Sequence, residues 1–441
     1  MSPEILGLVS LGALFVGIFV GFPISFTLIF LAIVFGYIGF GKVVFYLMVL
    51  QTFIIMREPL LAAVPLFLFM GYILEQAGLM DRLFSGFRMM LASVKGSLYI
   101  AVLTTATLFA AATGIVGASV TILGVMAAPI MKKSGYDPRL SAGSIAAGGT
   151  LGMLIPPSIM LVVMGPVVGV PITELFAAAV LPGILLAGLY TLYAVIRCYM
   201  RPELGPAMPV EERAGSAAEI VRELFVGIIP LAVLILAVLG SILGGLATPT
   251  DAAAMGALGA LVLAIAYRRL TWERLKTAVF RTIVTSSMIL LLVAASNFYG
   301  AVFARLGSAT MIAEALLAFD LSPTILLILI LGVIFLLGWP LEWVPIVLIV
   351  IPILLPAIEQ LGVDLVWFCT LVAVCLQTAW LSPPVALSAY YIKGVVPDWD
   401  LKDIYLGMMQ FMVIQVLGLL VVLFYPSIAL WLPELLFRSG G

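Results

Sequence analysis

Histidine is missing from this sequence, and charged residues are scarce. None of the 441 residues is histidine, which excludes histidine metal sites, histidine proton relays and Ser–His or Cys–His catalysis. Charged residues make up 10% of the chain and apolar residues 64%, whereas soluble domains carry ~25% charged residues. No water-exposed surface can be built from this composition, so we expect a membrane protein rather than a soluble protein with buried helices.

Two further scarcities narrow the function. The net charge is −1 and no Lys/Arg-rich tract is present to meet a phosphate backbone, which excludes nucleic acid as a partner. The three cysteines (Cys198, Cys369 and Cys375) lie in or beside apolar segments without metal-ligand spacing, and we expect them to pack as small apolar side chains. No pattern indicates an enzyme, a catalytic residue or an organic cofactor.

Long apolar runs are abundant. Clear examples cover residues 5–20, 180–196, 225–243 and 408–425, close to the ~20 residues that cross a bilayer as a helix. The residues before Ile5 carry no basic leader, so the first run is expected to be a retained span. The predicted fold class is therefore an all-α polytopic membrane protein.

The two halves of the chain repeat one another. Residues that recur 227 positions later are Pro129, Gly135, Asp137, Leu154, Pro156 and Pro157, which match Pro356, Gly362, Asp364, Leu381, Pro383 and Pro384. Gly71 and Gly78 recur 229 positions later, and Pro23 recurs 226 positions later. Because the matches keep their order, they favour duplication over coincidence among Gly- and Pro-rich spans. We predict one repeat over residues 1–200, a second over residues 224–441, and a polar cytoplasmic linker with an amphipathic helix over residues 201–223.

Basic residues indicate the orientation. Seventeen of the 21 Lys and Arg fall in five regions, around residues 82–95, 132–139, 197–222, 268–281 and 393–402. Placing all five on the cytoplasmic side gives one consistent path with both termini outside. Five crossings then separate Pro23 from Pro249, so the two repeats are predicted to be inverted, as in many secondary transporters.

Each half contains an apolar segment interrupted by an irregular tip. The segments cover residues 97–133, with a tip at 113–119, and residues 323–360, with a tip at 338–345. Each arm has about 12–17 residues, or roughly 18–26 Å, which is short of a ~30 Å hydrocarbon core. A re-entrant helical hairpin therefore fits better than two full crossings.

A second irregular segment follows each hairpin. Residues 138–170 and 365–392 each contain a Pro-Pro pair, at Pro156-Pro157 and Pro383-Pro384. Consecutive prolines remove two amide donors and clash with the preceding turn, so each helix is expected to break. A broken helix is tolerated inside a membrane where it lines a cavity or is buried in protein.

These interruptions supply ligands for ions. Unwound carbonyls and hydroxyls provide the oxygens that a dehydrated alkali cation needs, and half-helix N-termini favour an anion. We predict two cation sites flanking one anion site. The cation candidates are Thr113, Gly114, Gly117, Ser119, Gly149, Thr150, Gly152, Pro156, Gly338, Glu342, Gln377, Thr378 and Ser382. The substrate candidates are Ser119, Pro157, Ser158, Asn297 and Pro383. The alternative for each motif is a Gly/Pro kink that serves helix packing.

Three polar positions need separate interpretation. Glu342 is the one carboxylate at a hairpin tip, and ionisable residues inside a membrane are functional candidates. Asn297 could reach a substrate or bond to a neighbouring helix. Arg57 and Glu58 are expected to neutralise each other near an interface rather than to bind substrate.

Several of these strings resemble the large membrane subunit of TRAP (tripartite ATP-independent periplasmic) transporters. The resemblance extends from Pro23 to the Lys393 region. The strings are Thr248-Pro249-Thr250-Asp251-Ala252-Ala253, the tip at Gly114–Ser119, Ser134-Gly135-Tyr136-Asp137-Pro138, Thr150-Leu151-Gly152 with Ile155-Pro156-Pro157-Ser158, and Ser382-Pro383-Pro384-Val385. The Ile-Pro-Pro-Ser segment with the Gly-Tyr-Asp-Pro turn before it is the most specific of them.

The resemblance implies an elevator transporter in a bacterial inner membrane that couples Na⁺ to the uptake of a small organic anion. It also implies two partners, a small four-helix membrane subunit and a periplasmic substrate-binding protein. The sequence departs from the family pattern at Ser382, Ala386 and Glu342, where Thr, Gly and Asp are commoner, and Trp339 and Trp343 are bulky for a tip. The hydroxyl of Ser382 preserves a cation ligand, whereas the altered tip bears on the identity of the substrate.

Two other function classes remain open at this point. The chain could be a standalone sodium-coupled anion carrier of the same superfamily, which a missing gene for the four-helix subunit would favour. It could also be a channel or a structural membrane protein, which saturable, sodium-dependent flux would exclude.

Overall fold

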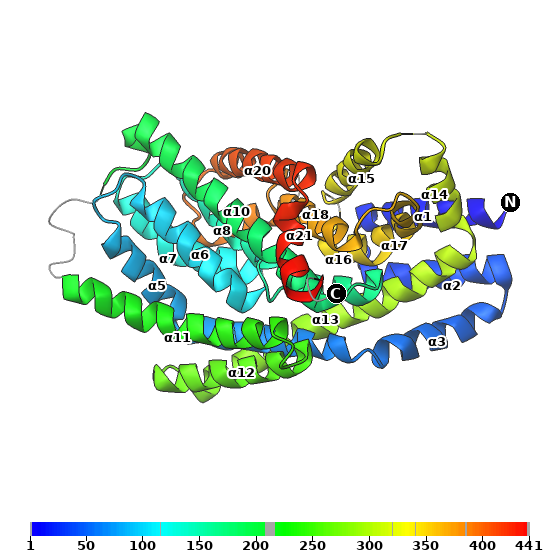
Figure 1. Cartoon of the computed structure of the whole chain (residues 1–441), viewed down its shortest axis with the longest axis horizontal. Coiled ribbons are helices and arrows are strands. Elements are labelled where there is room, and N and C mark those ends of the chain that lie inside the picture. Colours follow the sequence, from blue (N-terminus) through cyan, green and yellow to red (C-terminus); the bar gives the residue numbers. More distant parts are fainter. Residues whose placement is uncertain are drawn as a thin grey trace.

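The computed structural model describes residues 2–114, 116–207, 217–319, 321–339, 341–383 and 386–438 (Figure 1). Throughout these ranges the regular elements are helices. Nine helical segments of the described chain are long and apolar enough to cross a membrane. The prediction of an all-α polytopic membrane protein is confirmed.

Seven helices contact one another and form a group that we call the frame. They are α1 (Pro3–Val20), α2 (Ile24–Phe40), α3 (Val43–Met56), α4 (Ala63–Gln76), α11 (Ala217–Leu243), α12 (Pro249–Ala266) and α13 (Trp272–Arg305). A 3₁₀ turn, η1 (Pro59–Ala62), joins α3 to α4. The longest member, α13, has 34 residues and is therefore about 51 Å long. In Figure 1, α3, α11, α12 and α13 run along the lower side of the molecule.

The remaining long helices form a second group, which we call the inner group. Its first-half members are α6 (Ser97–Thr113), α7 (Val116–Lys133), α8 (Pro138–Thr150), η2 (Leu151–Met153), α9 (Ile159–Val168) and α10 (Ile172–Met200). Its second-half members are α15 (Pro323–Leu337), α16 (Trp343–Pro345), η5 (Ile346–Val350), α17 (Ile351–Gln360), α18 (Leu365–Gln377), η6 (Thr378–Trp380), α19 (Leu387–Val395) and α20 (Leu401–Phe424). Two short elements follow, α21 (Ser427–Pro433), which packs on α10, and η7 (Glu434–Arg438), which contacts α21.

Two short helices connect the groups. α5 (Leu79–Met90) packs on α11 of the frame and on α6 of the inner group, and α14 (Ser308–Leu317) packs on α1 and α17 in the same manner. Each begins directly after a glycine with positive φ, at Gly78 (φ 69°) and Gly307 (φ 79°). Glycine adopts this backbone conformation without steric cost, so the chain can reverse sharply at both places.

The helices that precede the Pro-Pro pairs, α8 and α18, begin in a similar way. A positive-φ glycine, Gly135 or Gly362, is followed two residues later by an aspartate at the helix N-cap. The Asp137 carboxylate accepts from the Leu140 amide at 2.8 Å, and the Asp364 carboxylate accepts from the Val366 amide at 2.8 Å. Such caps satisfy backbone donors that a helix start leaves free. The Gly-x-Asp pattern therefore fixes where α8 and α18 start.

Both of these helices end before their prolines. α8 and α18 tighten into the 3₁₀ turns η2 and η6, the backbone is then irregular, and α9 and α19 follow. The boundaries of α8 and η2 recur 227 residues later, at both ends, in α18 and η6. The helix boundaries therefore repeat at the same 227-residue offset as the matching Gly, Asp and Pro residues. Pro340, Pro384 and Val385, which the sequence analysis placed at the second tip and second break, lie outside the described residues.

The polar linker is only partly described. Its first residues form η3 (Pro202–Leu204), and the Leu204 carbonyl accepts from the Tyr99 hydroxyl at 2.7 Å. Residues 208–216, which include Glu211, Glu212 and Arg213, lie outside the description. Residues 217–223 are the described part of the expected amphipathic helix. They form the start of α11, which continues as one helix through an apolar span up to Leu243.

The two halves of the inner group are held together at one end. α8 and α20 are in backbone contact, since a Cβ at Gly407 would lie 1.9 Å from the Arg139 carbonyl oxygen. Beside this contact, Arg139 donates to Asp403 at 2.7 Å and Lys132 donates to Asp398 at 2.6 Å. The hydrogen bond from Lys132 lowers the pKa of Asp398 below its ordinary value. These ion pairs join α7 and α8 of the first half to the second-half loop and helix at residues 398–403.

Candidate functional site

A cavity of about 480 Å³ lies between the frame and the inner group. The frame contributes Leu68, Tyr72 and Glu75 of α4 and Arg281, Thr285, Met288 and Ile289 of α13. The inner group contributes Gly114, Val116, Gly117, Ala118, Thr121 and Ile122 of the first tip, Met153 and Ile159 of the first break, Glu342, Trp343 and Val344 of the second tip, and Trp380 and Tyr391. Both irregular tips therefore meet in one cavity against the middle of two frame helices.

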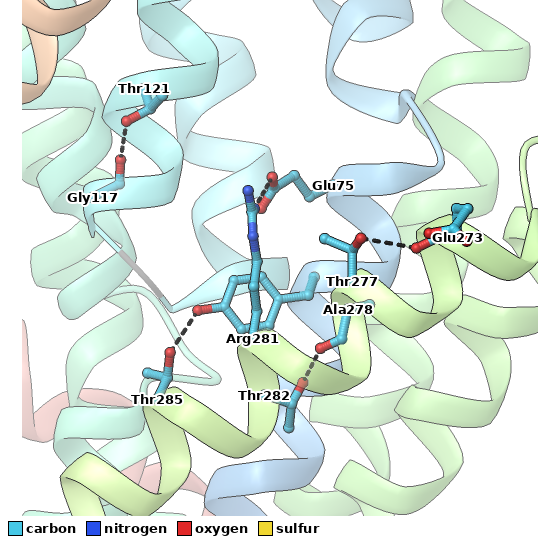
Figure 2. A network of polar contacts seen from close by, with 10 residues as sticks. Glu75, Gly117, Thr121, Glu273, Thr277, Ala278, Arg281, Thr282 and Thr285 are labelled. Atoms are coloured by element: carbon cyan, nitrogen blue, oxygen red, sulfur yellow. Dashed lines mark hydrogen bonds and ion pairs between the residues drawn. The ribbon is translucent and has the colours of Figure 1, made fainter.

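The most prominent charges of the cavity are an ion pair between frame helices. Nη1 of Arg281 donates to Oε1 of Glu75 at 2.8 Å, and the Arg281 side chain remains 49% exposed while that of Glu75 is 13% exposed (Figure 2). The guanidinium carbon lies 6.0 Å from the centre of the Tyr72 ring. Tyr72 and Thr285 share a hydroxyl–hydroxyl hydrogen bond of 2.9 Å. An arginine with unused N–H groups therefore faces the tips.

Sequence reasoning missed this arginine. It counted Arg281 among the basic residues of a cytoplasmic connection, whereas the structure places it inside α13, nine residues after the helix begins at Trp272. The connection ends earlier because Thr271 caps the helix, accepting from the Arg274 amide at 3.3 Å. The available signal was the helical spacing of Arg281, Thr285 and Ile289, which places the three on one face of a helix.

The first tip is built on glycines that touch neighbouring backbone and rings. Gly114 follows α6 as its C-cap with φ +60°, and a Cβ there would lie 3.5 Å from the Pro157 carbonyl oxygen of the first break. A Cβ at Gly117 would lie 2.9 Å from the ring of Tyr391 in α19. Thr113 ends α6, and its side chain is outside the description. Ser119 is buried within α7.

The first break packs directly against this tip. A Cβ at Gly149 would lie 2.3 Å from a methyl group of Val120, and one at Gly152 would lie 3.7 Å from the Cα atoms of Ala110 and Gly114. Thr150 and Ser158 are fully buried, and Pro156 and Pro157 are buried between them along the chain. The structure thus brings the first-half candidates together.

The second tip and second break enclose a small pocket. It measures about 40 Å³ and is lined by Gly338, Trp339, Leu341, Glu342, Ala379, Trp380 and Leu387. Gly338 lies against the break, since a Cβ there would be 3.1 Å from the Cβ of Ala379. Glu342 lines this pocket and the large cavity alike. The Glu342 carboxylate therefore borders both the large cavity, which could hold a small organic molecule, and the small pocket, which could hold an ion.

Gln377, Thr378 and Ser382 are buried around the second break, and Pro383 is half-buried. In both breaks, the hydroxyl protons are used within the backbone. Thr150 donates to Ala147, Ser158 to Met153, Thr378 to Cys375 and Ser382 to Thr378.

A hydroxyl that has donated its proton keeps lone pairs and can only accept from, or coordinate, a further partner. These four side chains are therefore suited to a cation rather than to an anion. The Ser158 hydroxyl, named above as a substrate candidate, likewise keeps only acceptor capacity here. On the frame side of the cavity, the Arg281 guanidinium and the Tyr72–Thr285 hydroxyl pair can donate to an anion.

Asn297 does not join either tip in this conformation. Its Nδ2 donates to Oε1 of Gln51 in α3 at 2.8 Å, which is the interhelical bond that the sequence analysis left open. Both residues line a separate cavity of about 350 Å³, together with Glu58, parts of α9 and Leu348. α13 thus presents one face to two cavities, Arg281–Ile289 to the first and Val293–Ala304 to the second.

Comparisons with known proteins agree with this arrangement. A family model described as "Tripartite ATP-independent periplasmic transporter, DctM component" matches residues 11–428. The chain is 28% identical over 424 residues to the sialic acid TRAP transporter large permease protein SiaM of Vibrio cholerae, covering 96% of this chain and 97% of that one. It is 30% identical over 383 residues to the C4-dicarboxylate TRAP transporter large permease protein DctM of Pseudomonas aeruginosa, covering 86% and 87%.

Among solved structures, the fold is similar to that of the Alcanivorax borkumensis YdaH transporter. The TM-score is 0.63 at 17% identity, and the match covers 98% of both chains. At this identity the likeness concerns the fold alone.

Proposed function

Because the chain belongs to the family of the DctM component of tripartite ATP-independent periplasmic transporters, we propose that it carries a small organic anion across the membrane together with sodium ions. The resemblance stated from the sequence is thereby confirmed at the level of the family. Relatives in this family are transporter permeases, and two of them are named for sialic acid and for C4-dicarboxylates, which are carboxylates. A carboxylate is accordingly our proposed substrate class.

The observation that carries the anion proposal is the position of Arg281. Its guanidinium faces both tips across the cavity and uses one N–H on Glu75. Guanidinium groups bind carboxylates through paired, charge-assisted hydrogen bonds. We propose that the substrate carboxylate binds Arg281, with one further donor from the Tyr72–Thr285 pair, because their mutual hydrogen bond uses only one of the two hydroxyl protons.

The cation proposal starts from the small pocket at the second tip. Glu342 supplies a negative charge, and the pocket has about the volume of one small ion or water. The buried hydroxyls of the two breaks offer further acceptor oxygens. We propose that Na⁺ at Glu342 offsets a charge that would otherwise repel a carboxylate in the adjoining cavity.

The architecture supports movement of the inner group against the frame. Both tips belong to the inner group, Arg281 and Glu75 belong to the frame, and α5 and α14 are the short links between the groups. The recurrence of helix boundaries at 227 residues supports two related halves. We propose that these halves are inverted repeats with re-entrant hairpins, and that transport is of the elevator type, with a binding protein outside and a small membrane subunit against the frame. We also propose an inner-membrane location with both termini in the periplasm.

Reconstitution in liposomes tests the function. The chain is tested with an inward sodium gradient, alone and with the small subunit and binding protein, using radiolabelled carboxylates. We expect sodium-dependent uptake only with all three proteins. Robust uptake by the chain alone would favour the standalone carrier, and non-saturable flux would favour a channel.

The arginine is tested in the same assay. Arg281→Gln should raise the substrate KM on the order of tenfold to a hundredfold, the effect of losing a charge-assisted bond of about 1.5–3 kcal/mol. Arg274→Gln is the matched control, because Arg274 lies on the same helix and donates to the Arg269 carbonyl at 2.9 Å, outside the cavity. Equal KM values for the two variants would exclude Arg281 as a ligand of the substrate anion.

A further inference from the structure

One buried amide links α20 to the end of α18. Gln415 is completely buried, and its Nε2 donates to the Val374 carbonyl at 2.9 Å. The same nitrogen lies 3.4 Å from Oε1 of Gln377. Carbonyls in the last turn of a helix lack an intrahelical donor, and leaving one unpaired in an apolar interior is costly. Gln415 therefore satisfies a group that the break of α18 sets free.

The same helix also touches the residue after the break. Met412 lies one turn before Gln415, and its sulfur is 2.9 Å from Oγ of Ser382. α20 thus holds the second break on both sides, at Val374 and at Ser382. In the described part of the chain, Oε1 of Gln415 and Nε2 of Gln377 have no hydrogen-bond partner. Buried polar atoms in folded proteins usually have a hydrogen-bond partner. Packing alone therefore does not explain why this pair of amides is buried here.

We propose that Gln415 is a positioning residue that fixes the end of the broken helix α18 and thereby sets the affinity for the coupling cation. This inference rests on the proposed sodium coupling. Gln415 lines neither the large cavity nor the small pocket, so it acts through the break and not by touching the substrate. Residues that orient ion ligands contribute a factor of about 10–100 to ion affinity in metal sites.

The test is the sodium dependence of transport by the reconstituted three-protein system. Gln415→Met keeps the length of the side chain and removes the amide. We expect the half-saturating Na⁺ concentration to rise about tenfold, while the substrate KM at saturating Na⁺ stays within twofold of wild type.

The matched control is Gln410→Met on the same helix. Gln410 also bonds to a neighbouring helix, accepting from the Tyr193 hydroxyl at 2.7 Å, but it lies away from the break. This variant should leave the sodium dependence unchanged. If Gln415→Met does not accumulate in membranes, Gln415→Asn, which keeps the amide at shorter reach, is measured against the same criterion.

The outcomes separate the two proposals. Wild-type transport without sodium dependence would reject the proposed function. Sodium-dependent wild type, with Gln415 variants that change only the maximal rate or that match Gln410→Met, would reject the positioning role alone. Sodium-dependent thermal stabilisation of the detergent-purified proteins gives a second readout that does not involve substrate.

Discussion

The ring of Tyr391 in α19 rests directly on Gly117 at the first tip, so that a Cβ at position 117 would lie 2.9 Å from Cζ of the ring. The same ring stacks on Trp380 of the second break, with centroids 6.4 Å apart. A residue of the second half therefore closes the cavity against the tip of the first half, and the tip can carry no side chain at this position.

Gly117→Ala should consequently impair transport. The added methyl group must displace Tyr391 or the tip, at a cost of about 1–3 kcal/mol for overpacking. We expect a lower rate of uptake and a lower melting temperature of the purified protein. Gly332→Ala in α15, where a Cβ meets nothing within 4 Å, is the control. Tyr391→Leu should partly restore the melting temperature of Gly117→Ala, and failure to do so would place the steric conflict elsewhere.

Glu342→Gln should weaken sodium binding. The substitution removes the one charge that lines both the small pocket and the large cavity, and a charge-assisted contact of about 1.5–3 kcal/mol corresponds to roughly tenfold or more in half-saturating Na⁺. Glu359→Gln, at the exposed end of α17, should leave the sodium dependence unchanged. Unaltered sodium dependence in Glu342→Gln would exclude this carboxylate as a cation ligand.

Glu75→Gln should strengthen substrate binding. Glu75 holds one N–H of Arg281 at 2.8 Å, so its negative charge opposes the binding of a substrate carboxylate to the same guanidinium. Removing the Glu75 charge should lower the substrate KM severalfold, about the effect of 1 kcal/mol. The double variant with Arg281→Gln should resemble Arg281→Gln alone. A higher KM for Glu75→Gln would mean that Glu75 orients the arginine instead of competing for it.

Ser382→Ala and Ser119→Ala should each raise the Na⁺ concentration required for half-maximal uptake more than they reduce expression. Ser382 donates its proton to the Thr378 carbonyl, which leaves its lone pairs for a cation. Ser286→Ala is the control, because its hydroxyl also donates to a backbone carbonyl, that of Thr282 in α13, away from the breaks. If both variants transport with wild-type sodium dependence, neither serine hydroxyl is a cation ligand.

Ala386→Gly should stabilise the protein. Ala386 adopts φ +31° directly before α19, a left-handed conformation that costs a residue with a Cβ about 1–2 kcal/mol. Glycine removes this cost but gains conformational freedom in the unfolded chain. We therefore expect the free energy of unfolding to increase by about 0.5–1 kcal/mol. Thermal unfolding of the purified variant measures it, and a decrease would show that the methyl group packs usefully.

The sequence alone determined the class of the protein, its family and the location of its irregular segments. The scarcity of charge led to a membrane protein, and Gly135, Asp137 and the Pro-Pro pair located the start and the end of α8. These features are local: positive φ, an N-cap and a missing N–H act within a few residues of the chain, so they can be read without knowing what packs nearby.

Tertiary structure decided which of these segments meet and which side chains face them. Arg281 and Glu75 are 206 residues apart, and their pairing depends on how α4 and α13 pack. Arg281 looked like a loop residue because basic clusters usually end spans, whereas α13 begins nine residues earlier. Tyr391 reaches Gly117 only once the two halves are assembled, and Gln415 reaches Gln377 only once α20 packs on α18. Contacts of this kind depend on helix packing and on the burial it creates, and no spacing along the chain encodes either one.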